Sequence, residues 1–374
     1  MTRNFYLSLF ICSLFLIQQA TAQQKFVHPG ILHGNAALDL IHQRVNGAKQ
    51  PWLGGVEALR ANPFSSSAYK VKGGFDSVAR EKDFGLHAQE VNNDCIAAYY
   101  NALMWTATGK KAHAEKAVEI LNAYSYKLKA IVRRDKELLA GLNGSHFLNA
   151  AEIIRYSYKG WDPKDIAQCE KMFLEVFYPV VKSYAPWANG NWGNACLKTA
   201  MAIGVFCNNR EIFDDAVNYY LKGEGNASLP NYIYESGQCQ ESGRDQAHAQ
   251  LGLGNLAECA EIAYNQGIDL YGALNNRLLK GFEYTAKYNL GGEVPFEVKS
   301  DVTKKYMHQT VSADNRGEFR PIYEMVYNHY QNRKGINAPY TKKVIDKIRP
   351  EGAGPRPYDQ PGFGTLTFSL KKSE

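Results

Sequence analysis

The sequence lacks several features by which common classes of protein are recognised. Beyond the apolar run that ends at Ile17, no segment approaches the length of a membrane-spanning helix. Lys and Arg form no block, and the net charge is only +6 over 374 residues, which argues against nucleic-acid binding. The cysteines include no CxxC pair and no zinc spacing. These absences disfavour a nucleic-acid partner, a membrane span in the mature chain and a metal site built on cysteine.

Cysteine is scattered along the chain instead of being paired. The cysteines that follow Cys12 belong to a chain long enough to bury a large core. We therefore expect them to be buried small side chains and not a disulfide framework. They are Cys95, Cys169, Cys196, Cys207, Cys239 and Cys259.

The first residues have the pattern of a signal peptide. Arg3 supplies a positive charge, an apolar run extends over residues 5–17, and Ala20-Thr21-Ala22 forms a small-x-small cleavage motif before Gln23. We expect residues 1–22 to be removed. The mature chain, residues 23–374, is then expected to be soluble and either periplasmic or secreted.

Apolar residues recur at i, i+3, i+4 and i+7 through most of the mature chain, which is the period of an amphipathic helix. Clusters of Gly, Pro, Asn and Asp separate these segments and act as stop and cap signals. The fold class predicted from this pattern is all-α. The predicted helices cover residues 92–108, 112–131, 145–158, 163–184, 194–207, 212–221, 242–264, 270–288 and 320–332.

Several of these helices are rich in Ala, Gly and Tyr, which favours an inner layer of closely packed backbones. An inner helix of small residues followed by an outer charged helix, repeated along the chain, is typical of an incomplete (α/α) toroid of about six to seven hairpins. The linkers are short, so a single domain is expected. The Pro- and Gly-rich residues 350–364 are expected to lie extended across the surface.

Two polar clusters are candidates for chemistry. Glu241, Arg244 and His248 are spaced i, i+3 and i+7, which places them on one helical face, and Gly252 would leave room for a ligand. Asn191, beside Trp192, could donate hydrogen bonds to a carboxylate while the ring stacks on a sugar. The alternatives are ordinary ones, because a lone His is usually structural and an Asn such as Asn194 is usually a helix cap.

Two further clusters follow later in the chain. A tyrosine in a loop, Tyr306 or Tyr288, could act as acid and base if nearby cations lower its pKa from about 10. Arg316 and Arg320 precede a helix that begins with Pro, and one of them could clamp a carboxylate while the other holds the loop. For any single Tyr, packing is the commoner role.

Other polar residues are expected at the starts of inner helices, which gather at one rim of a toroid. His87, Asn92 and Asn93 belong to one such group, and Asn143 and His146 to another. We expect them to line a substrate groove, and the alternative is that the Asn residues are ordinary caps.

These residue types fit β-elimination from a uronic-acid polymer. The proton at C5 of a uronate is too weakly acidic for Tyr or His to remove until hydrogen bonds neutralise the adjacent carboxylate. A base then removes this proton, and an acid protonates the departing O4. The product carries a 4,5-unsaturated uronate end.

Four segments resemble the alginate lyase superfamily of helical-toroid polysaccharide lyases, particularly its Bacteroidetes branch. They are GNWGNA, QESGRDQAHAQLGLGNLAE, YTAKYNLGGEVPFE and RGEFRPIYEMVYNHY, and the similarity extends over nearly all of the mature chain. The resemblance implies that an Asn and a His act at the sugar carboxylate, that a Tyr moves protons, that an Arg stabilises charge, and that no metal or cofactor takes part.

By this resemblance Asn191 matches the Asn, His248 the His, and Arg244 or Arg316 the Arg. Tyr306 is the first choice for the Tyr and Tyr288 the second. The chain departs from the best-known alginate lyases where Trp192 follows the Asn in place of His. The His must then come from another helix.

We therefore expect a polysaccharide lyase whose partner is an acidic polysaccharide, with alginate preferred and glucuronan next. A glycoside hydrolase on the same kind of toroid is an alternative, and it would need two carboxylates, recruited from Glu241, Asp245 and Glu90. A non-catalytic glycan-binding protein is the third possibility. Carboxylates are sparse in the four clusters, which favours the lyase.

Overall fold

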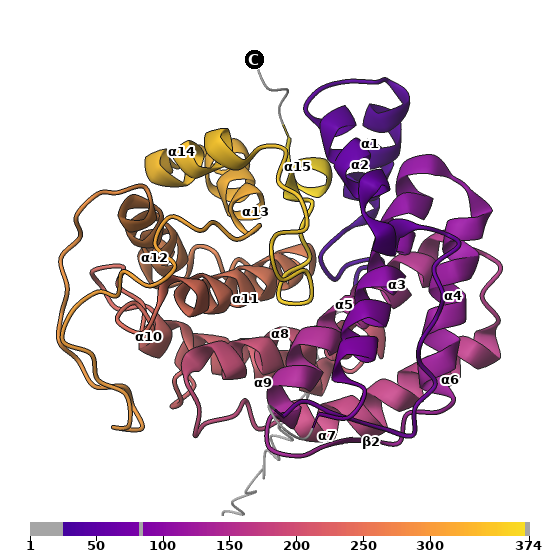
Figure 1. The fold of residues 1–374 in the computed structure, drawn as a ribbon, viewed down its shortest axis with the longest axis horizontal. Coiled ribbons are helices and arrows are strands. Elements are labelled where there is room, and N and C mark those ends of the chain that lie inside the picture. Colours follow the sequence, from indigo (N-terminus) through magenta and orange to yellow (C-terminus); the bar gives the residue numbers. More distant parts are fainter. Residues whose placement is uncertain (1–24, 82–84, 371–374) are drawn as a thin grey trace, which may run out of the picture.

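The computed structural model describes residues 25–81 and 85–370, and helices make up most of this part of the chain (Figure 1). The predicted signal peptide, residues 1–22, lies outside the described residues. Two short strands, β1 (Ser77–Ala79) and β2 (Ala130–Val132), pair in parallel. The prediction of a single all-α domain is confirmed.

Four long helices form the inner layer. Their small side chains allow the backbones to approach closely: a Cβ added to Gly141 would lie 2.6 Å from the carbonyl carbon of Ala195 on the next inner helix. Most of their residues are buried, including the polar ones. The inner helices are α3 (Ala88–Thr108), α5 (Lys136–Ser157), α8 (Gly190–Phe206) and α11 (Gln246–Asn265).

Neighbouring inner helices begin at the same rim. Early in α5, Asn143 donates a hydrogen bond to Asn92, which lies early in α3 (2.9 Å). At the other end of the same pair, the Trp105 indole N–H donates to the Ser157 hydroxyl (2.9 Å). The ends of α5 and α8 also meet, because Arg155 donates to the carbonyl of the last residue of α8 (2.9 Å).

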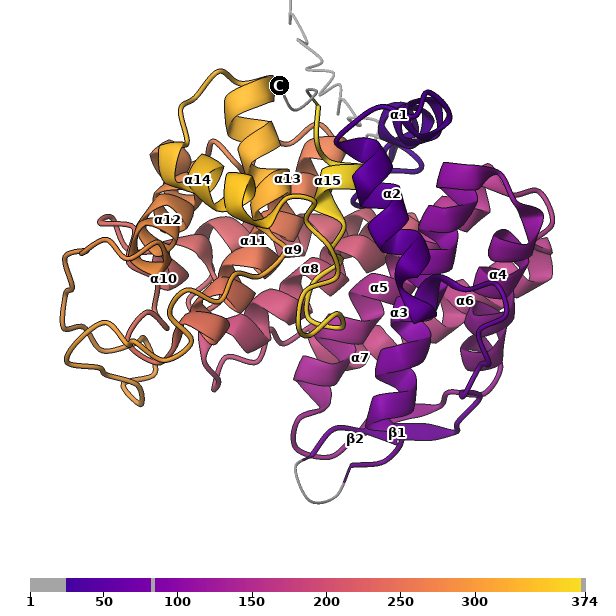
Figure 2. The ribbon, with the colours of Figure 1, turned by 45° about the horizontal axis from the view of Figure 1, so that its top comes forward.

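An outer helix follows each inner one and covers it from outside (Figures 1 and 2). The starts of two outer helices are capped by side chains: Asp162 accepts from the Lys164 N–H (2.8 Å), and Asn209 from the Ile212 N–H (3.1 Å). The outer helices are α4 (Lys111–Ser125), α6 (Pro163–Met172), α9 (Arg210–Lys222) and α12 (Ala273–Asn289). A π-helical segment η2 (Phe173–Phe177) and α7 (Tyr178–Val181) extend α6, and α10 (Leu229–Tyr232) follows α9.

Further helices flank the ring at both ends of the chain. The N-terminal ones are α1 (Asn35–Asn46), α2 (Trp52–Ala61) and the short η1 (Pro63–Ser65); the C-terminal ones are α13 (Tyr323–Tyr327), η3 (Asn328–Arg333), α14 (Pro339–Ile348) and α15 (Gly364–Thr367). Helices α1, α2 and α14 were not expected. Helix α5 also begins at Lys136, well before the predicted start at residue 145, so Asn143 and His146 lie inside it.

Only part of the C-terminal tail lies on the surface as expected: residues 354–356 are exposed, whereas residues 359–364 are buried. Asp359 and Gln360 are only 3% and 1% exposed. The Gln360 carbonyl lies 3.3 Å from His146 Nε2 of α5, and its side chain donates to the Leu251 carbonyl of α11 (3.4 Å). The tail therefore bridges two inner helices across the ring, and these polar contacts allow irregular backbone to be buried.

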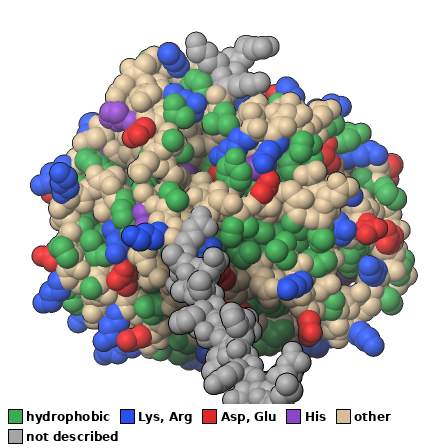
Figure 3. Space-filling model, turned by 180° about the vertical axis from the view of Figure 1, so that it is seen from behind, with side chains coloured by type: hydrophobic (Ala, Val, Ile, Leu, Met, Phe, Trp, Pro, Cys, Tyr) green, Lys and Arg blue, Asp and Glu red, His purple; other side chains and the backbone are tan. Residues whose placement is uncertain are grey.

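The distribution of charged side chains and the state of the cysteines agree with the predictions from sequence. Basic and acidic side chains are interspersed over the face shown in Figure 3. The six cysteines are free, and all are buried except Cys207, which is partly exposed. Within residues 25–81 and 85–370, none of the helices combines the length and apolar character that crossing a bilayer requires.

A buried ion pair joins two inner helices. Lys198 Nζ of α8 lies 2.8 Å from Glu258 Oε1 of α11, and the two side chains are 0% and 1% exposed. The hydroxyl of Ser145 on α5 donates to the other carboxylate oxygen of Glu258 (3.3 Å). Such a pair has overcome a large desolvation cost, so each charge depends on the other.

Replacing Lys198 by Ala should lower the free energy of unfolding by about 3–5 kcal/mol, because it leaves the Glu258 carboxylate buried without its cation. The double variant Lys198→Met/Glu258→Leu should lose clearly less, since no unpaired charge remains. Urea unfolding of both variants measures the difference. An equal loss in the two would show that packing, and not charge, sets the cost.

Candidate active site

The buried carboxylate of Glu241 joins three segments of the chain. Its Oε1 accepts from Asn191 Nδ2 (2.7 Å) and Arg244 Nη1 (2.8 Å), and its Oε2 accepts from the Asn191 N–H (3.0 Å) and the Tyr232 hydroxyl (3.1 Å). Burial raises the pKa of this carboxyl, and the Arg244 charge opposes the rise. Glu241 is fully buried and its carboxylate is occupied by donors of the protein, so its contact with substrate stays a prediction. It is an anchor for its neighbours.

The same turn fixes the start of α8. Gln240 Oε1 accepts from the Gly190 N–H (3.0 Å), and Gln240 Nε2 donates to Asn189 Oδ1 (2.9 Å). With Glu241 accepting from the next backbone N–H, two of the free donors at this helix start have side-chain partners. A carboxylate is also favoured there by the helix dipole.

Asn191 and His248 belong to one network, but Asn191 lies beneath the surface. It is fully buried, and its amide N–H is directed to Glu241. Its direct contact with a sugar carboxylate stays a prediction. Asn194 is not the cap of α8 either, because it lies within the helix and Asn189 occupies the cap position.

Arg244 and His248 are the exposed part of the network. Their side chains are 31% and 29% exposed, and Arg244 Nη2 lies 3.1 Å from His248 Nε2. Asp245 lies between them in sequence and caps α11 by accepting from the His248 N–H (2.7 Å). Its second carboxylate oxygen is 2.6 Å from His248 Nδ1.

These contacts define the tautomer of His248. A guanidinium only donates, so Nε2 must accept from Arg244. Burial alone would raise the pKa of the Asp245 carboxyl, but the hydrogen bonds from the His248 side chain and backbone outweigh burial, and the pKa is lowered. The ionised carboxylate therefore accepts from Nδ1–H. In this tautomer the lone pair of His248 lies on Nε2.

The sequence indicated that Gly252 would leave room for a ligand, but the structure shows that this space is filled. A Cβ there would lie 1.9 Å from the hydroxyl oxygen of Tyr232. The glycine instead admits the Tyr232 ring, whose hydroxyl reaches Glu241.

A long irregular segment after α12 crosses the starts of α8 and α11. The Asp301 carboxylate accepts from the Tyr306 N–H (2.8 Å) and from Asn226 (2.8 Å), and Asn226 also donates to the Ala188 carbonyl (2.9 Å) just before α8. Further on, His308 packs against Gly243, where a Cβ would meet it at 2.3 Å. The backbone of Tyr306 is thus fixed in a segment that contacts the residues preceding α8, through Asn226, and the turn preceding α11, through His308.

Tyr288 and Arg316 hold this segment together. Tyr288 is 4% exposed, and the Arg316 guanidinium lies 3.9 Å from the centroid of its ring. Arg316 also donates to the carbonyls of Tyr288 (2.9 Å) and Gly292 (3.1 Å). Both side chains have structural partners, which argues against the catalytic roles considered for them.

Three other predicted binding residues are buried. Arg320 Nη1 donates to Asp359 (2.6 Å) and Gln360 (3.0 Å), so it secures the tail. Asn143 donates to Asn92 within the inner layer. Burial lowers the pKa of His146 to about 4. All three side chains have partners inside the protein, and their contact with substrate stays a prediction.

The remaining predicted residues are partly exposed. His87 stacks on Phe75 with centroids 3.7 Å apart, just before α3, and Asn92 and Asn93 follow in its first turns. Trp192 packs against a small apolar cluster that includes Leu251. Their roles in a groove stay predictions.

Two partners of the network were missed by reasoning from sequence. Asp245 had been considered only as a hydrolase carboxylate, although an Asp three residues before a His at a helix start is a recognisable cap signal. Tyr232 carried no signal, because its approach to Glu241 depends on Gly252 of another helix.

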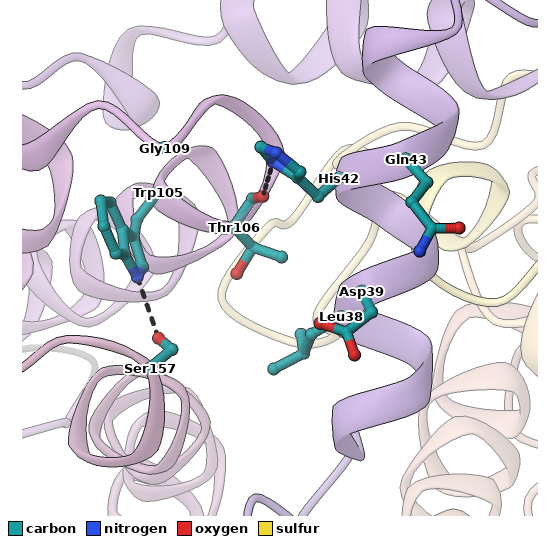
Figure 4. A pocket seen from close by; sticks show the side chains of 8 residues that line it. All are labelled: Leu38, Asp39, His42, Gln43, Trp105, Thr106, Gly109 and Ser157. Carbon is teal, nitrogen blue, oxygen red and sulfur yellow. Dashed lines mark hydrogen bonds between the residues drawn. The ribbon is translucent and has the colours of Figure 1, made fainter.

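Two adjoining hollows lie at the opposite rim and hold none of these residues. They have volumes of about 350 and 740 Å³ and share Trp105 and Ser157, at the ends of α3 and α5. Figure 4 shows the first, where His42 lies 3.3 Å from the Thr106 carbonyl. The candidate acid–base residues lie at the other rim, so these hollows do not coincide with the candidate active site.

The fold and the network define a helical toroid that carries an arginine and an acid–base pair at one rim. The alginate lyase family model matches residues 56–296, more than half of the chain, and the protein belongs to this family. No curated protein sequence matches the chain significantly.

Solved structures with the same fold include three structures of two alginate lyases. Alginate lyase A1-III from Sphingomonas species A1 has 15% identity and a TM-score of 0.64, over 89% of this chain and 95% of that one. A histidine-to-alanine variant of A1-III in complex with a tetrasaccharide has 15% identity and a TM-score of 0.66, over 93% and 98%. An alginate lyase from Bacteroides ovatus has 13% identity and a TM-score of 0.60, over 92% and 100%.

Proposed function

We propose that this polysaccharide lyase cleaves alginate or a related polyuronate by β-elimination, and that Arg244, His248 and Tyr306 carry the reaction. The single observation that supports this most is the chain of contacts from Asn191 through Glu241 and Arg244 to His248. Family membership and the alginate lyase structures, one of them with a bound tetrasaccharide, point to the same chemistry.

Arg244 neutralises the uronate carboxylate. One of its N–H groups is directed to Glu241 and another to His248, and the side chain is 31% exposed, so further donors can reach a ligand. Neutralising the carboxylate lets charge from C5 spread into it, which makes the C5 proton removable. Because Glu241 holds the guanidinium, little reorganisation is needed when substrate arrives.

His248 is the base. Its Nε2 lone pair accepts from Arg244 in the free protein. When a guanidinium N–H turns to the substrate carboxylate, Nε2 is released and can accept the C5 proton. Asp245 then stabilises the imidazolium through Nδ1–H.

Tyr306 is the acid that protonates the departing O4. Its backbone is fixed through Asp301 to Asn226, which lies against the residues that precede α8. Tyr288 is less suited to this role, since Arg316 stacks on its buried ring.

Hydrolysis is disfavoured because the carboxylates of Glu241 and Asp245 are already engaged by groups of the protein. Glu241 is buried under four donors, and Asp245 is occupied by the helix start and by His248. A glycoside hydrolase needs two carboxylates that face the scissile bond.

The signal-peptide pattern of residues 1–22 supports a periplasmic or secreted location. A polymer too large to enter the cell would be accessible to the enzyme there.

A panel of mannuronate-rich alginate, guluronate-rich alginate and glucuronan tests the reaction. At least one polymer should give rising ultraviolet absorbance, because elimination creates a double bond conjugated to the carboxylate. His248→Ala should lower kcat at least about 100-fold with an unchanged melting temperature. Shortening of the chains without absorbance would identify a hydrolase.

Tyr306→Phe should lower kcat by about 100-fold or more, because the phenyl ring cannot supply a proton to O4. Tyr288→Phe, the matched control, should keep at least about half of the activity. Both are measured by the absorbance assay on the best polymer. The reverse ranking of the two variants would move the acid role to Tyr288.

Asp245→Asn should lower kcat/KM at least about tenfold and move the acidic limb of its pH profile to lower pH. The amide still caps α11, but protonation of His248 loses the negative charge beside it. Asp162→Asn makes the same change at the start of α6 and should leave the profile unmoved. A profile that stays in place in Asp245→Asn would mean that Asp245 is only a cap.

A further inference from the structure

A hollow of about 310 Å³ opens on the outer side of the ring, away from the network around Glu241. Its floor is the face of α12 that carries Lys280, Glu283, Tyr284 and Lys287, which follow one another at i, i+3, i+4 and i+7. Tyr340 of α14, Ser236, and residues 294–295 of the segment after α12 form its walls. Figures 1 and 2 show α12 and α14 side by side.

The lining of the hollow is net positive, because its two lysines outnumber its one carboxylate, Glu283. Lys280 and Lys287 line it and are half-buried, and neither takes part in any ion pair formed within residues 25–81 and 85–370. The acidic residue between them is already engaged. Both oxygens of Glu283 accept from backbone N–H groups at the start of α14, those of Tyr340 (2.9 Å) and Thr341 (2.8 Å).

The rest of the lining is aromatic or apolar. Tyr284 is 7% exposed, and its hydroxyl donates to the Pro295 carbonyl (2.6 Å), which fixes the wall against the floor. Tyr340 is half-buried, and Lys343 Nζ lies 5.4 Å from the centroid of its ring, which adds a third cation beside the hollow. An aromatic wall with cations around it suits a ligand that has both an apolar face and negative charge.

On the remaining side of the hollow, the turn that contains Ser236 packs closely against α12. Gly237, next to Ser236, has a φ of +90°, and a Cβ there would lie 2.5 Å from the Lys280 carbonyl oxygen. The turn leads directly to Gln240 and Glu241. Only a few residues of the chain therefore separate the hollow from the candidate active site.

We propose that this hollow is an accessory site for a carboxylated sugar residue of the polymer, bound outside the catalytic groove. The sugar packs against Tyr340, and Lys280 and Lys287 hold its carboxylate or those of adjacent units. Cations at both ends of a hollow favour a chain that carries repeated carboxylates over a neutral glycan. The proposal rests on the proposed polyuronate substrate, and its effect is to retain long chains near the enzyme.

The double variant Lys280→Ala/Lys287→Ala tests the accessory site. On the preferred polymer its KM should rise about three- to tenfold with kcat unchanged, as expected for the loss of two exposed charge contacts. On a uronate tetrasaccharide, which has few units left to reach the hollow once the catalytic site is filled, kcat/KM should change less than on the polymer. Lys287→Glu should raise the polymer KM further than Lys287→Ala, because it repels the chain.

Lys49→Ala/Lys222→Ala is the matched control, since it removes the same charge from two exposed lysines elsewhere. It should leave the polymer KM within about twofold of the parent value. An unchanged polymer KM in Lys280→Ala/Lys287→Ala, or an equal loss on polymer and tetrasaccharide, would overturn the accessory site. Failure of the proposed function is a separate outcome, because the parent protein would then cleave no polyuronate at all.

Discussion

The candidate site depends on one constraint, the need to satisfy a fully buried carboxylate. Glu241 can remain ionised within the protein only while donors surround it, and the donors come from α8, α10 and the start of α11. Bringing them together sets the position of Arg244, and through Arg244 that of His248. Charge in the interior thus determines the geometry of groups at the surface.

The ring places this network where a polyanion would be attracted. Contacts between neighbouring inner helices show that they begin at one rim, and a helix start carries partial positive charge. The chain is also mildly basic overall, without a dense patch that would attract nucleic acid. A polymer with one carboxylate on each unit is suited to such a weak, distributed field, while the specific contacts are left to a few side chains.

Local geometry decided what could be predicted from sequence. Arg244 and His248 were identified from helical spacing, although Arg244 lies in the turn before α11 and meets His248 across the cap residue Asp245. The repeated amphipathic pattern was sufficient for an all-α toroid. Exposure could not be predicted: His146 lies on an inner helix that is buried on nearly every side, and Arg320 lies in an irregular segment buried against the C-terminal tail. The role of Gly252 depends on a ring from another helix and leaves no local trace.

The C-terminal tail was the other misjudged element, since Pro and Gly usually mark surface segments. The Ser369 carbonyl accepts from Arg44 (2.6 Å) and from Trp52 (3.0 Å), so the last part of the chain that the structure describes is fastened to α1 and α2. Contacts of such long sequence separation form late and slowly. A chain threaded through a membrane from its N-terminus would therefore emerge almost completely before its ring could close, and exposed apolar surface would have to be protected until then.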